Sequence, residues 1–375
     1  MPQTAPSPLV QLDAIIATDV APHAREVDQQ GRFPREALAA LARGGILGLT
    51  SATAVGGAGA GLAEAAQVVE RLGQVCTSTA MIVCMHYAAT AVIEAHGPQD
   101  IRRAIAAGRH LSTLAFSEAG SRAHFWAPLS TATASGDTVR LDARKSWVTS
   151  ASQADSYVWS SRSLDGKGIS LWLVDRTTPG LAIAGAFDGL GLRGNDSSPV
   201  TATAASISAD RRLGDDGQGF GVMMGVVLPW FQVMNAAMSI GVMNAVVEAT
   251  IRHATTTRYE HLGQTLAEQP HARARIAGMR VRTDQARALW LDTLAAIATQ
   301  RGDQMLRILQ VKLVASDAAL EVTDQAMRVC GGAAFRREVG VERWLRDARA
   351  AAVMAPTSDA LTDFIGKAVC GLPLF

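Results

Sequence analysis

The 375-residue chain lacks several patterns that mark whole classes of protein. Its 35 basic and 34 acidic side chains nearly cancel, so no excess of one sign favours nucleic acid or an anionic membrane surface. No stretch reaches about 18 uninterrupted apolar residues, and the first residues show no basic segment followed by a long apolar run. These absences predict a cytoplasmic protein with no nucleic-acid partner and no membrane span.

The cysteines and glycines also lack two familiar spacings. Cys76, Cys84, Cys330 and Cys370 form no CxxC pair and no His/Cys ligand pattern, so we expect buried free thiols and no metal. The cluster "VGGAGAGLAEA" has Leu62 where a dinucleotide-binding fingerprint requires its third glycine. It therefore predicts a loop that enters a helix.

The hydrophobic pattern changes its period twice along the chain. Residues 1–110 carry apolar side chains at helical spacing, and several of these runs end in glycine. Residues 111–218 hold short β-rich runs with turns such as "SGD" and "LDGKG" between them, which indicates an antiparallel sheet. Residues 219–375 return to long helical patterns, typical of a four-helix bundle that supports an oligomer. The sequence thus predicts a mainly α, α+β fold: an N-terminal helical domain, a middle antiparallel β domain and a C-terminal four-helix bundle.

Five stretches in this order resemble the acyl-CoA dehydrogenase superfamily across nearly the whole chain. They are "LAFSEAG", "LDARKSWVTSASQAD", "GLRGNDSS…LGDDGQGFGV", "RYEHLGQTLAEQP" and "QAMRVCGGAAFRREVGVERWLRDARAA". The resemblance implies the fold of that family, an FAD-dependent oxidoreductase activity and a homotetramer. In the family, FAD lies extended between the β domain and the C-terminal bundle.

The resemblance also implies which residues contact FAD. Phe116 and Ser117 match the segment that faces the flavin pyrimidine edge, while Trp147 and Thr149 match residues near the isoalloxazine and its N5 region. A flavin needs fixed donors at the pyrimidine edge, because they stabilise the negative charge of the reduced ring.

Further FAD contacts are implied in the second half of the chain. The matching residues are Arg258, Gln325, Gly331, Gly332 and Thr357. Arg258 would reach the pyrophosphate, although "RYEHLGQ" departs from the family's "RxxFG" by an extra residue and by Leu262 at the aromatic position. Glycine suits a close approach of backbone to cofactor because it has no Cβ.

The family's catalytic base is missing at both of its recognised positions. Dehydrogenation needs a base that removes the α proton while hydride leaves the β carbon for flavin N5. In "VMAPTSDALTDF" the first glutamate of the family's "YEGTSE" is matched by Ala355, and the alternative position on the first long C-terminal helix is matched by Phe231. His86, in "VCMHYAAT", is the candidate substitute, because related flavin monooxygenases place a histidine there. The other groups considered are Glu118, His124 and Asp359.

Three functions stay open on these observations. The first is a dehydrogenase that oxidises an acyl group carried on CoA or a carrier protein and passes electrons to an electron-transfer flavoprotein. The second is a flavin-dependent monooxygenase or oxidase of the same fold, and the third is a non-catalytic oligomeric binding protein. The intact flavin-facing positions disfavour the third function. The segment "AAAVMAPTSD" lacks the second histidine that such monooxygenases often carry, which favours the first function over the second. The sequence does not identify the acyl substrate.

Overall fold

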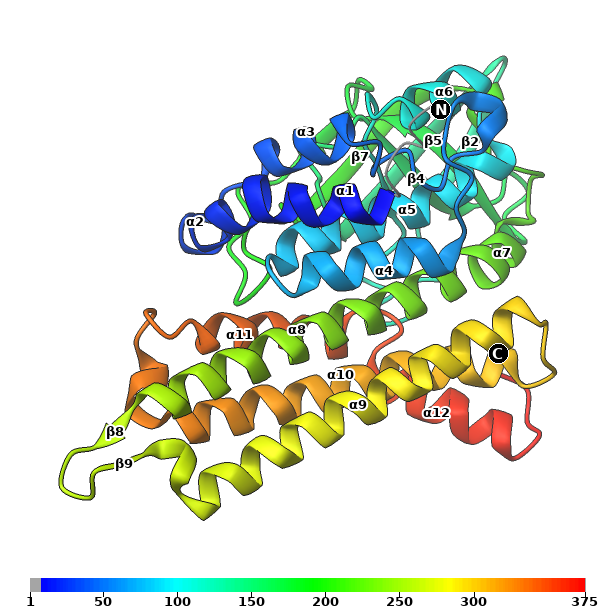
Figure 1. The fold of residues 1–375 in the computed structure, drawn as a ribbon. Helices are drawn as coiled ribbons and strands as arrows, with labels where there is room; N and C mark the ends of the chain where they lie inside the picture. The colour runs from blue at the N-terminus through cyan, green and yellow to red at the C-terminus, as the bar shows by residue number, and fades with distance from the viewer. Residues whose placement is uncertain (1–7, 375) are drawn as a thin grey trace, which may run out of the picture. The chain divides into compact units, whose positions relative to one another are not determined.

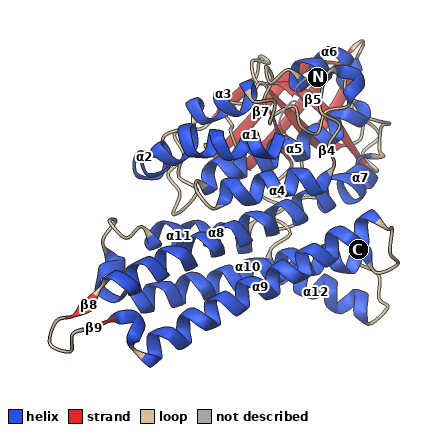
Figure 2. Ribbon diagram, in the orientation of Figure 1, coloured by secondary structure: helices blue, strands red, loops and turns tan. Residues whose placement is uncertain are grey.

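The computed structural model describes residues 8–374, which form two compact units (Figure 1). The first unit runs to Val68 and includes Ser78–Asp188 and Arg193–Phe231; the second contains Val69–Thr77, Gly189–Leu192 and the chain from Gln232 onward. Helices come first along the chain, then strands, then helices again (Figure 2). This order confirms the fold class predicted from the change in hydrophobic period.

Six α-helices precede the strands: α1 (Pro8–Ile15), α2 (Ala24–Gln30), α3 (Arg35–Arg43), α4 (Leu62–Gly73), α5 (Thr77–His96) and α6 (Gln99–Ala106). The glycine cluster before α4 is a loop, as predicted, and Glu64 Oε2 accepts the Gly61 N–H at 3.0 Å where the helix begins. The helix α5 is apolar nearly all round because it is buried in the core of its unit.

Seven strands form two sheets in the first unit: β1 (Ser112–Ala115), β2 (Thr131–Ser135), β3 (Thr138–Val148), β4 (Ser156–Arg162), β5 (Ile169–Asp175), β6 (Leu181–Ile183) and β7 (Ser198–Ser208). One sheet has the order β1-β4-β5 and the other β2-β3-β7-β6. The pairs are antiparallel as predicted, except that β1 runs parallel to β4, with Ser112 opposite Ser156. The prediction missed this pair because its partners lie 44 positions apart in the chain.

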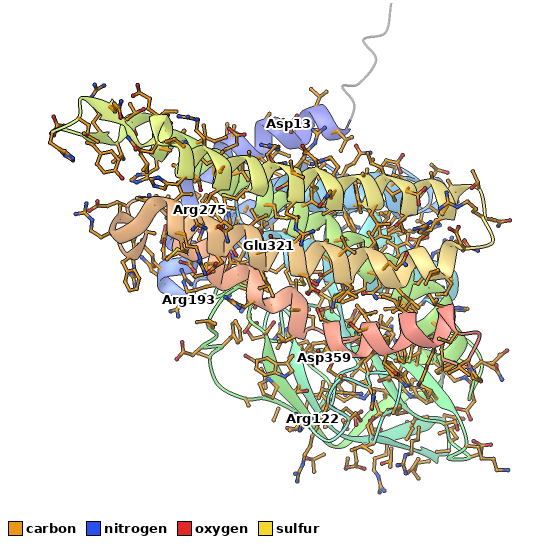
Figure 3. The ribbon with its side chains drawn as sticks, turned by 90° about the horizontal axis from the view of Figure 1, so that it is seen from below. Asp13, Arg122, Arg193, Arg275, Glu321 and Asp359 are labelled. Carbon is orange, nitrogen blue, oxygen red and sulfur yellow. The ribbon has the colours of Figure 1, made fainter. Side chains whose placement is uncertain are left out.

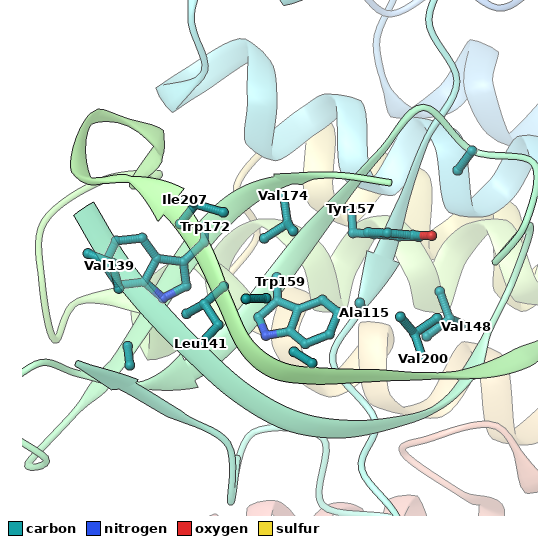
Figure 4. Close-up of a cluster of buried hydrophobic side chains, with 14 of the residues drawn as sticks. Ala115, Val139, Leu141, Val148, Tyr157, Trp159, Trp172, Val174, Val200 and Ile207 are labelled. Atoms are coloured by element: carbon teal, nitrogen blue, oxygen red, sulfur yellow. The ribbon is translucent and has the colours of Figure 1, made fainter. Parts of the chain in front are cut away.

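Both sheets contribute to one hydrophobic core (Figure 4). Trp159 and Trp172 from β4 and β5 are fully buried there, together with Val139 and Leu141 from β3 and Ile207 from β7. The strand β3 alternates buried and exposed residues along part of its length, whereas β4 and β5 are buried on both faces. This core fixes the frame from which the loops of the β region extend.

The second unit is built from long helices: α8 (Leu228–Thr256) from Gln232 onward, α9 (Pro270–Ala298), α10 (Gln304–Cys330), α11 (Val341–Val353) and α12 (Ser358–Val369). The short helix α7 (Gly219–Val222) precedes α8, and a hairpin of β8 (Arg258–Tyr259) and β9 (Gln264–Thr265) joins α8 to α9. Pro270 starts α9, where its missing N–H leaves no helical hydrogen bond unmade. The Trp290 Nε1–H of α9 donates to the Val233 carbonyl of α8 at 3.2 Å.

Two helical segments, Thr77–His96 and Gly219–Thr256, are long and apolar enough to cross a membrane. Their apolar windows are 78% and 83% buried inside the protein, as in core helices, so they are weak evidence for a membrane span. Of the four cysteines, Cys370 is exposed, against our expectation, and the other three are buried free thiols.

Candidate active site

Trp147 lies at a bulge in β3, where the register against β7 shifts between Lys145 and Val148. Its φ is +57°, a left-handed conformation that is an outlier for a bulky residue. The indole is 71% exposed, although it belongs to a strand whose next residue is buried. Backbone strain and bulges of this kind cluster at sites that hold a ligand, so Trp147 marks a candidate site.

The structure brings the first group of predicted flavin contacts together. The Ser146 N–H donates to the Ser117 carbonyl at 2.9 Å, so the segment after β1 lies beside the end of β3. Phe116 is buried next to Ser117, and Thr149 is buried with its hydroxyl 3.3 Å from that of Ser197. Phe116, Ser117, Trp147 and Thr149 therefore come from two adjoining segments of one unit.

A buried ion pair joins the same two segments. Lys145 Nζ lies 2.6 Å from Glu118 Oε1, and both side chains are almost completely buried. Lys145 also donates to the Ser160 carbonyl at 2.7 Å, while the Ser130 hydroxyl donates to Glu118 at 2.6 Å. Burial lowers the pKa of Lys145 to about 8, against the pull of Glu118. Burial opposes ionisation of Glu118, but the Lys145 charge and its donors outweigh it and hold the pKa of Glu118 below its usual range.

Sequence reasoning gave Glu118 a supporting role in its loop and did not single out Lys145. The signal was present in "RLDARKSWV", since Lys145 follows the exposed Arg144 and so falls on the inward phase of the strand. A buried lysine that keeps its charge needs a partner of opposite charge, and Glu118 supplies it.

In the second unit, Arg258 lies in the exposed β8–β9 hairpin, where its Nη2 donates to the Gly263 carbonyl at 2.6 Å. Gly331 follows α10 with a φ of +57°, a conformation that favours glycine. A Cβ built on Gly331 or Gly332 would meet no atom of the described chain within 4 Å. No neighbouring atom of the described chain therefore excludes a side chain at position 332. The backbone at Gly331 and Gly332 is also open to a ligand.

Gln325 lines a groove of about 300 Å³ between α9 and α10. The Arg275 guanidinium donates to Gln325 Oε1, and Arg282 pairs with Glu321 at 2.8 Å. Figure 3 labels Arg275 and Glu321 on these two helices. The groove therefore presents two arginines that both contact α10, Arg282 through a carboxylate and Arg275 through a neutral amide.

The segment between α11 and α12 carries Ala355, which the family resemblance matches to the catalytic base. Ala355 is half-buried, and the carbonyls on either side of it, those of Met354 and Pro356, accept hydrogen bonds from Lys312 Nζ at 2.9 and 2.7 Å. Lys312 belongs to α10 and is fully buried, and burial lowers its pKa to about 7. The backbone that carries Ala355 is thus fixed, but its side chain is a methyl group that accepts no proton.

The remaining predicted positions have local roles. Thr357 caps α12, since its hydroxyl accepts the Ala360 N–H at 3.3 Å. Phe231 is a buried residue of α8. Asp359 is exposed in the first turn of α12, and the His124 ring lies 5.1 Å from that of Trp126 in the loop before β2.

His86 is fully buried in α5 with both ring nitrogens in use. Its Nε2 lies 3.0 Å from the Leu47 carbonyl, and its Nδ1 accepts the Ser112 N–H at 3.2 Å. These partners define a neutral ring that carries its proton on Nε2. Burial lowers the pKa of His86 to about 4. The contacts favour a structural role, because neither nitrogen is free to exchange a proton with a substrate.

Along the chain, a two-sheet region lies between two helical regions, and a strained, exposed tryptophan lies near the end of one of its strands. Three family models match the chain: the acyl-CoA dehydrogenase N-terminal domain at residues 11–108, the middle domain at 113–204 and the C-terminal domain at 217–370. The chain belongs to the acyl-CoA dehydrogenase family and is an enzyme of that FAD-dependent class.

Relatives match along most of their length. A cyclohex-1-ene-1-carbonyl-CoA dehydrogenase of Geobacter metallireducens is 28% identical over 365 residues, 95% of each chain. The bovine short-chain specific acyl-CoA dehydrogenase of mitochondria is 28% identical over 350 residues, 91% of this chain and 84% of its own. The solved butyryl-CoA dehydrogenase of Megasphaera elsdenii shares the fold with a TM-score of 0.90 at 21% identity, covering 98% of this chain and 99% of its own. These findings confirm the dehydrogenase prediction at family level and do not favour the monooxygenase alternative.

Proposed function

We propose that this enzyme oxidises an acyl group carried as a thioester, with noncovalent FAD as the hydride acceptor at N5. The observation that carries the proposal is Trp147, a large, exposed side chain at a strained bulge, next to Ser146, whose N–H donates to the Ser117 carbonyl. Phe116 and Ser117 would present donors to the pyrimidine edge of the flavin, and Trp147 would cover the ring. Their positions in adjoining segments support one binding surface.

The phosphate-bearing half of the cofactor would be held by residues of the second unit. We assign this role to Arg258, Gln325, Gly331, Gly332 and Thr357. The two glycines support it, since their accessible backbone permits close approach of a ligand. Gln325 and Arg258 keep polar atoms at exposed or half-buried sites from which a pyrophosphate can be reached.

Coenzyme A is the thioester carrier that we favour over a carrier protein. A groove of about 350 Å³ in the first unit is lined by Trp126, Arg162, Lys167 and Phe220, among others. Two cations and two aromatic rings suit an arm that bears phosphates and a stacking base. A carrier protein would present a phosphopantetheine without that base, so the aromatic half of the groove would be unused.

We further propose a homotetramer in the cytoplasm that passes electrons to an electron-transfer flavoprotein. The helix α9 supports an oligomer, because it exposes Val281 and Leu291 by more than half. Exposed apolar side chains on a long helix are available for a contact between subunits. Light scattering on the FAD-loaded protein tests this point, and a monomer would contradict it.

Anaerobic mixing tests the proposed activity directly. The purified protein should be yellow and release FAD on denaturation, and a suitable acyl-CoA should bleach the visible absorbance of the oxidised flavin. A Trp147→Ala variant should hold FAD more weakly than wild type, whereas Leu372→Ala, at an exposed residue to which no cofactor role is assigned, serves as the matched control. A colourless protein that takes up no FAD would overturn the proposal.

A further inference from the structure

Two buried side-chain amides on α8 stand out because three of their four polar atoms have no hydrogen-bond partner among the described residues. Gln232 and Asn235 are both fully buried. Gln232 Nε2 and Oε1 and Asn235 Oδ1 have no partner among the residues that the structure describes. The remaining amide atom, Asn235 Nδ2, donates a hydrogen bond to the Met354 sulfur at 3.5 Å, a weak acceptor. Native proteins leave few buried polar atoms unpaired, so this pair requires an explanation.

The pair lies beside the vacant base position. Residues three apart on a helix are neighbours on one face, so Gln232 and Asn235 share a face of α8. Met354, which Asn235 contacts, directly precedes Ala355. Lys312 holds the carbonyls of Met354 and Pro356, which keeps this segment in place from α10. All of these residues belong to the second unit.

The chemistry of the pair limits what can bind there. An amide offers both a donor and an acceptor, so it pairs well with a hydroxyl, an amide or a carbonyl. A plain alkyl chain would leave all three atoms unpaired in a dry site, which is costly. A carboxylate would be a buried charge for which two neutral amides supply no counter-charge, and Lys312 is committed to its two carbonyls.

We propose that Gln232 and Asn235 form a polar acyl subsite that binds a neutral hydrogen-bonding group on the acyl chain. The substrate class is thus a hydroxyl-, amide- or carbonyl-bearing acyl thioester rather than a straight-chain fatty acyl group. The proposal rests on the proposed function, because it places the acyl chain beside Ala355. Ordered water in place of an acyl substituent is the competing occupant.

Ligand binding to the FAD-loaded enzyme tests the subsite. Butanoyl-CoA, 3-hydroxybutanoyl-CoA and 4-hydroxybutanoyl-CoA are titrated, and Kd is read from the shift of the flavin spectrum, which requires no turnover. Wild type should bind at least one hydroxylated thioester about tenfold or more tighter than butanoyl-CoA, as expected when a site is built to pair a hydroxyl. Gln232→Leu and Asn235→Leu should reduce that preference to about onefold.

A paired amide on the same helix provides the control. Asn244 Oδ1 accepts a hydrogen bond from Arg280 Nη1 at 3.2 Å, so Asn244→Leu breaks a contact that Gln232→Leu does not. Asn244→Leu should lower the melting temperature and keep the ligand preference. Gln232→Leu should keep or raise the melting temperature of the ligand-free enzyme, because it removes unpaired polar atoms.

The subsite is overturned if the wild type prefers butanoyl-CoA or binds all three thioesters equally, which is the result expected if water pairs with the two amides. It is also overturned if both leucine variants keep the preference for a hydroxylated thioester. If the FAD-loaded wild type binds none of the thioesters, the thioester carrier of the proposed function is wrong. The subsite is then judged by the same criterion with the free acids, 4-hydroxybutanoate against butanoate.

Discussion

His86 should make the stability of this enzyme depend on pH in a definite direction. The folded protein holds its ring neutral, and protonation of Nδ1 would break the hydrogen bond from the Ser112 N–H. The folded pKa of about 4 lies below the ordinary 6.5, so the unfolded chain binds more protons than the folded one between these values. The contribution of His86 is therefore fully present above about pH 6.5 and is lost as pH falls towards 4.

The size of the effect follows from the two pKa values. The full difference corresponds to about 3 kcal/mol of unfolding free energy, and about 2 kcal/mol of it is lost by pH 5. The test compares wild type with His86→Gln, whose side-chain amide can still donate to the Leu47 carbonyl but does not titrate. Denaturant unfolding at pH 7.5 and 5.0 should show the variant less stable at pH 7.5 and less sensitive to acid by about 2 kcal/mol.

His271, an exposed residue of α9, supplies the control, because His271→Gln should leave the acid sensitivity as in wild type. Equal losses of stability in wild type and His86→Gln would refute the neutral, buried histidine. A second result would also count against the structural role: His86→Gln with normal stability and FAD content but flavin reduction slowed by about 100-fold or more, as expected for an acid-base group.

Three further outcomes are expected. With a saturated acyl-CoA, flavin reduction in Ala355→Glu should be about 10²- to 10⁴-fold faster than in Ala355→Gln, because the glutamate restores a positioned base. Equal reduction rates in two variants that both bind the acyl-CoA would show that Ala355 does not occupy the position of a lost base. Trp147→Gly should stabilise the FAD-free protein by roughly 1 kcal/mol, because glycine adopts the positive φ without strain, and this is measured by thermal melts. The same variant should bind FAD more weakly in a titration, and an unchanged FAD affinity would show that Trp147 does not belong to the site. The folded pKa of Lys312 is lowered to about 7, so the unfolding free energy of the wild type should rise between about pH 7 and 10.5. The denaturant midpoint of Lys312→Met should rise less over this range. Equal rises of the midpoint in wild type and variant would contradict a neutral Lys312.

Local patterns predicted most of the fold. The strands β2 to β5 were readable because turn residues separate runs of β-branched and aromatic side chains, and the long helices α8 to α10 because their apolar spacing persists over many turns. The parallel β1–β4 pair was not readable, since nothing in "STLA" indicates which distant strand it meets. Pairing at long range depends on the packing of the whole unit.

The site was predictable only in part for a similar reason. The segments around Ser117 and Trp147 carry a family pattern, whereas the polar groups that support them depend on tertiary contacts. Lys312 in "LQVKLVAS" resembles a surface lysine until α10 is packed and its amine meets two carbonyls. Gln232 likewise reads as an ordinary helical residue, because a missing partner is visible only in three dimensions.

The buried ion pair of Lys145 and Glu118 constrains how this enzyme can diverge. Loss of one partner leaves an uncompensated charge in the interior, which commonly costs about 3–5 kcal/mol, whereas replacement of both by apolar residues is often neutral. A single substitution at either position is thus a deleterious intermediate, and the two sites should change together or not at all. Among descendants of one ancestor, Lys145 and Glu118 should therefore be kept together or lost together. A lineage that has lost only one of them should carry a compensating change at Ser130 or Ser160, which also contact the pair.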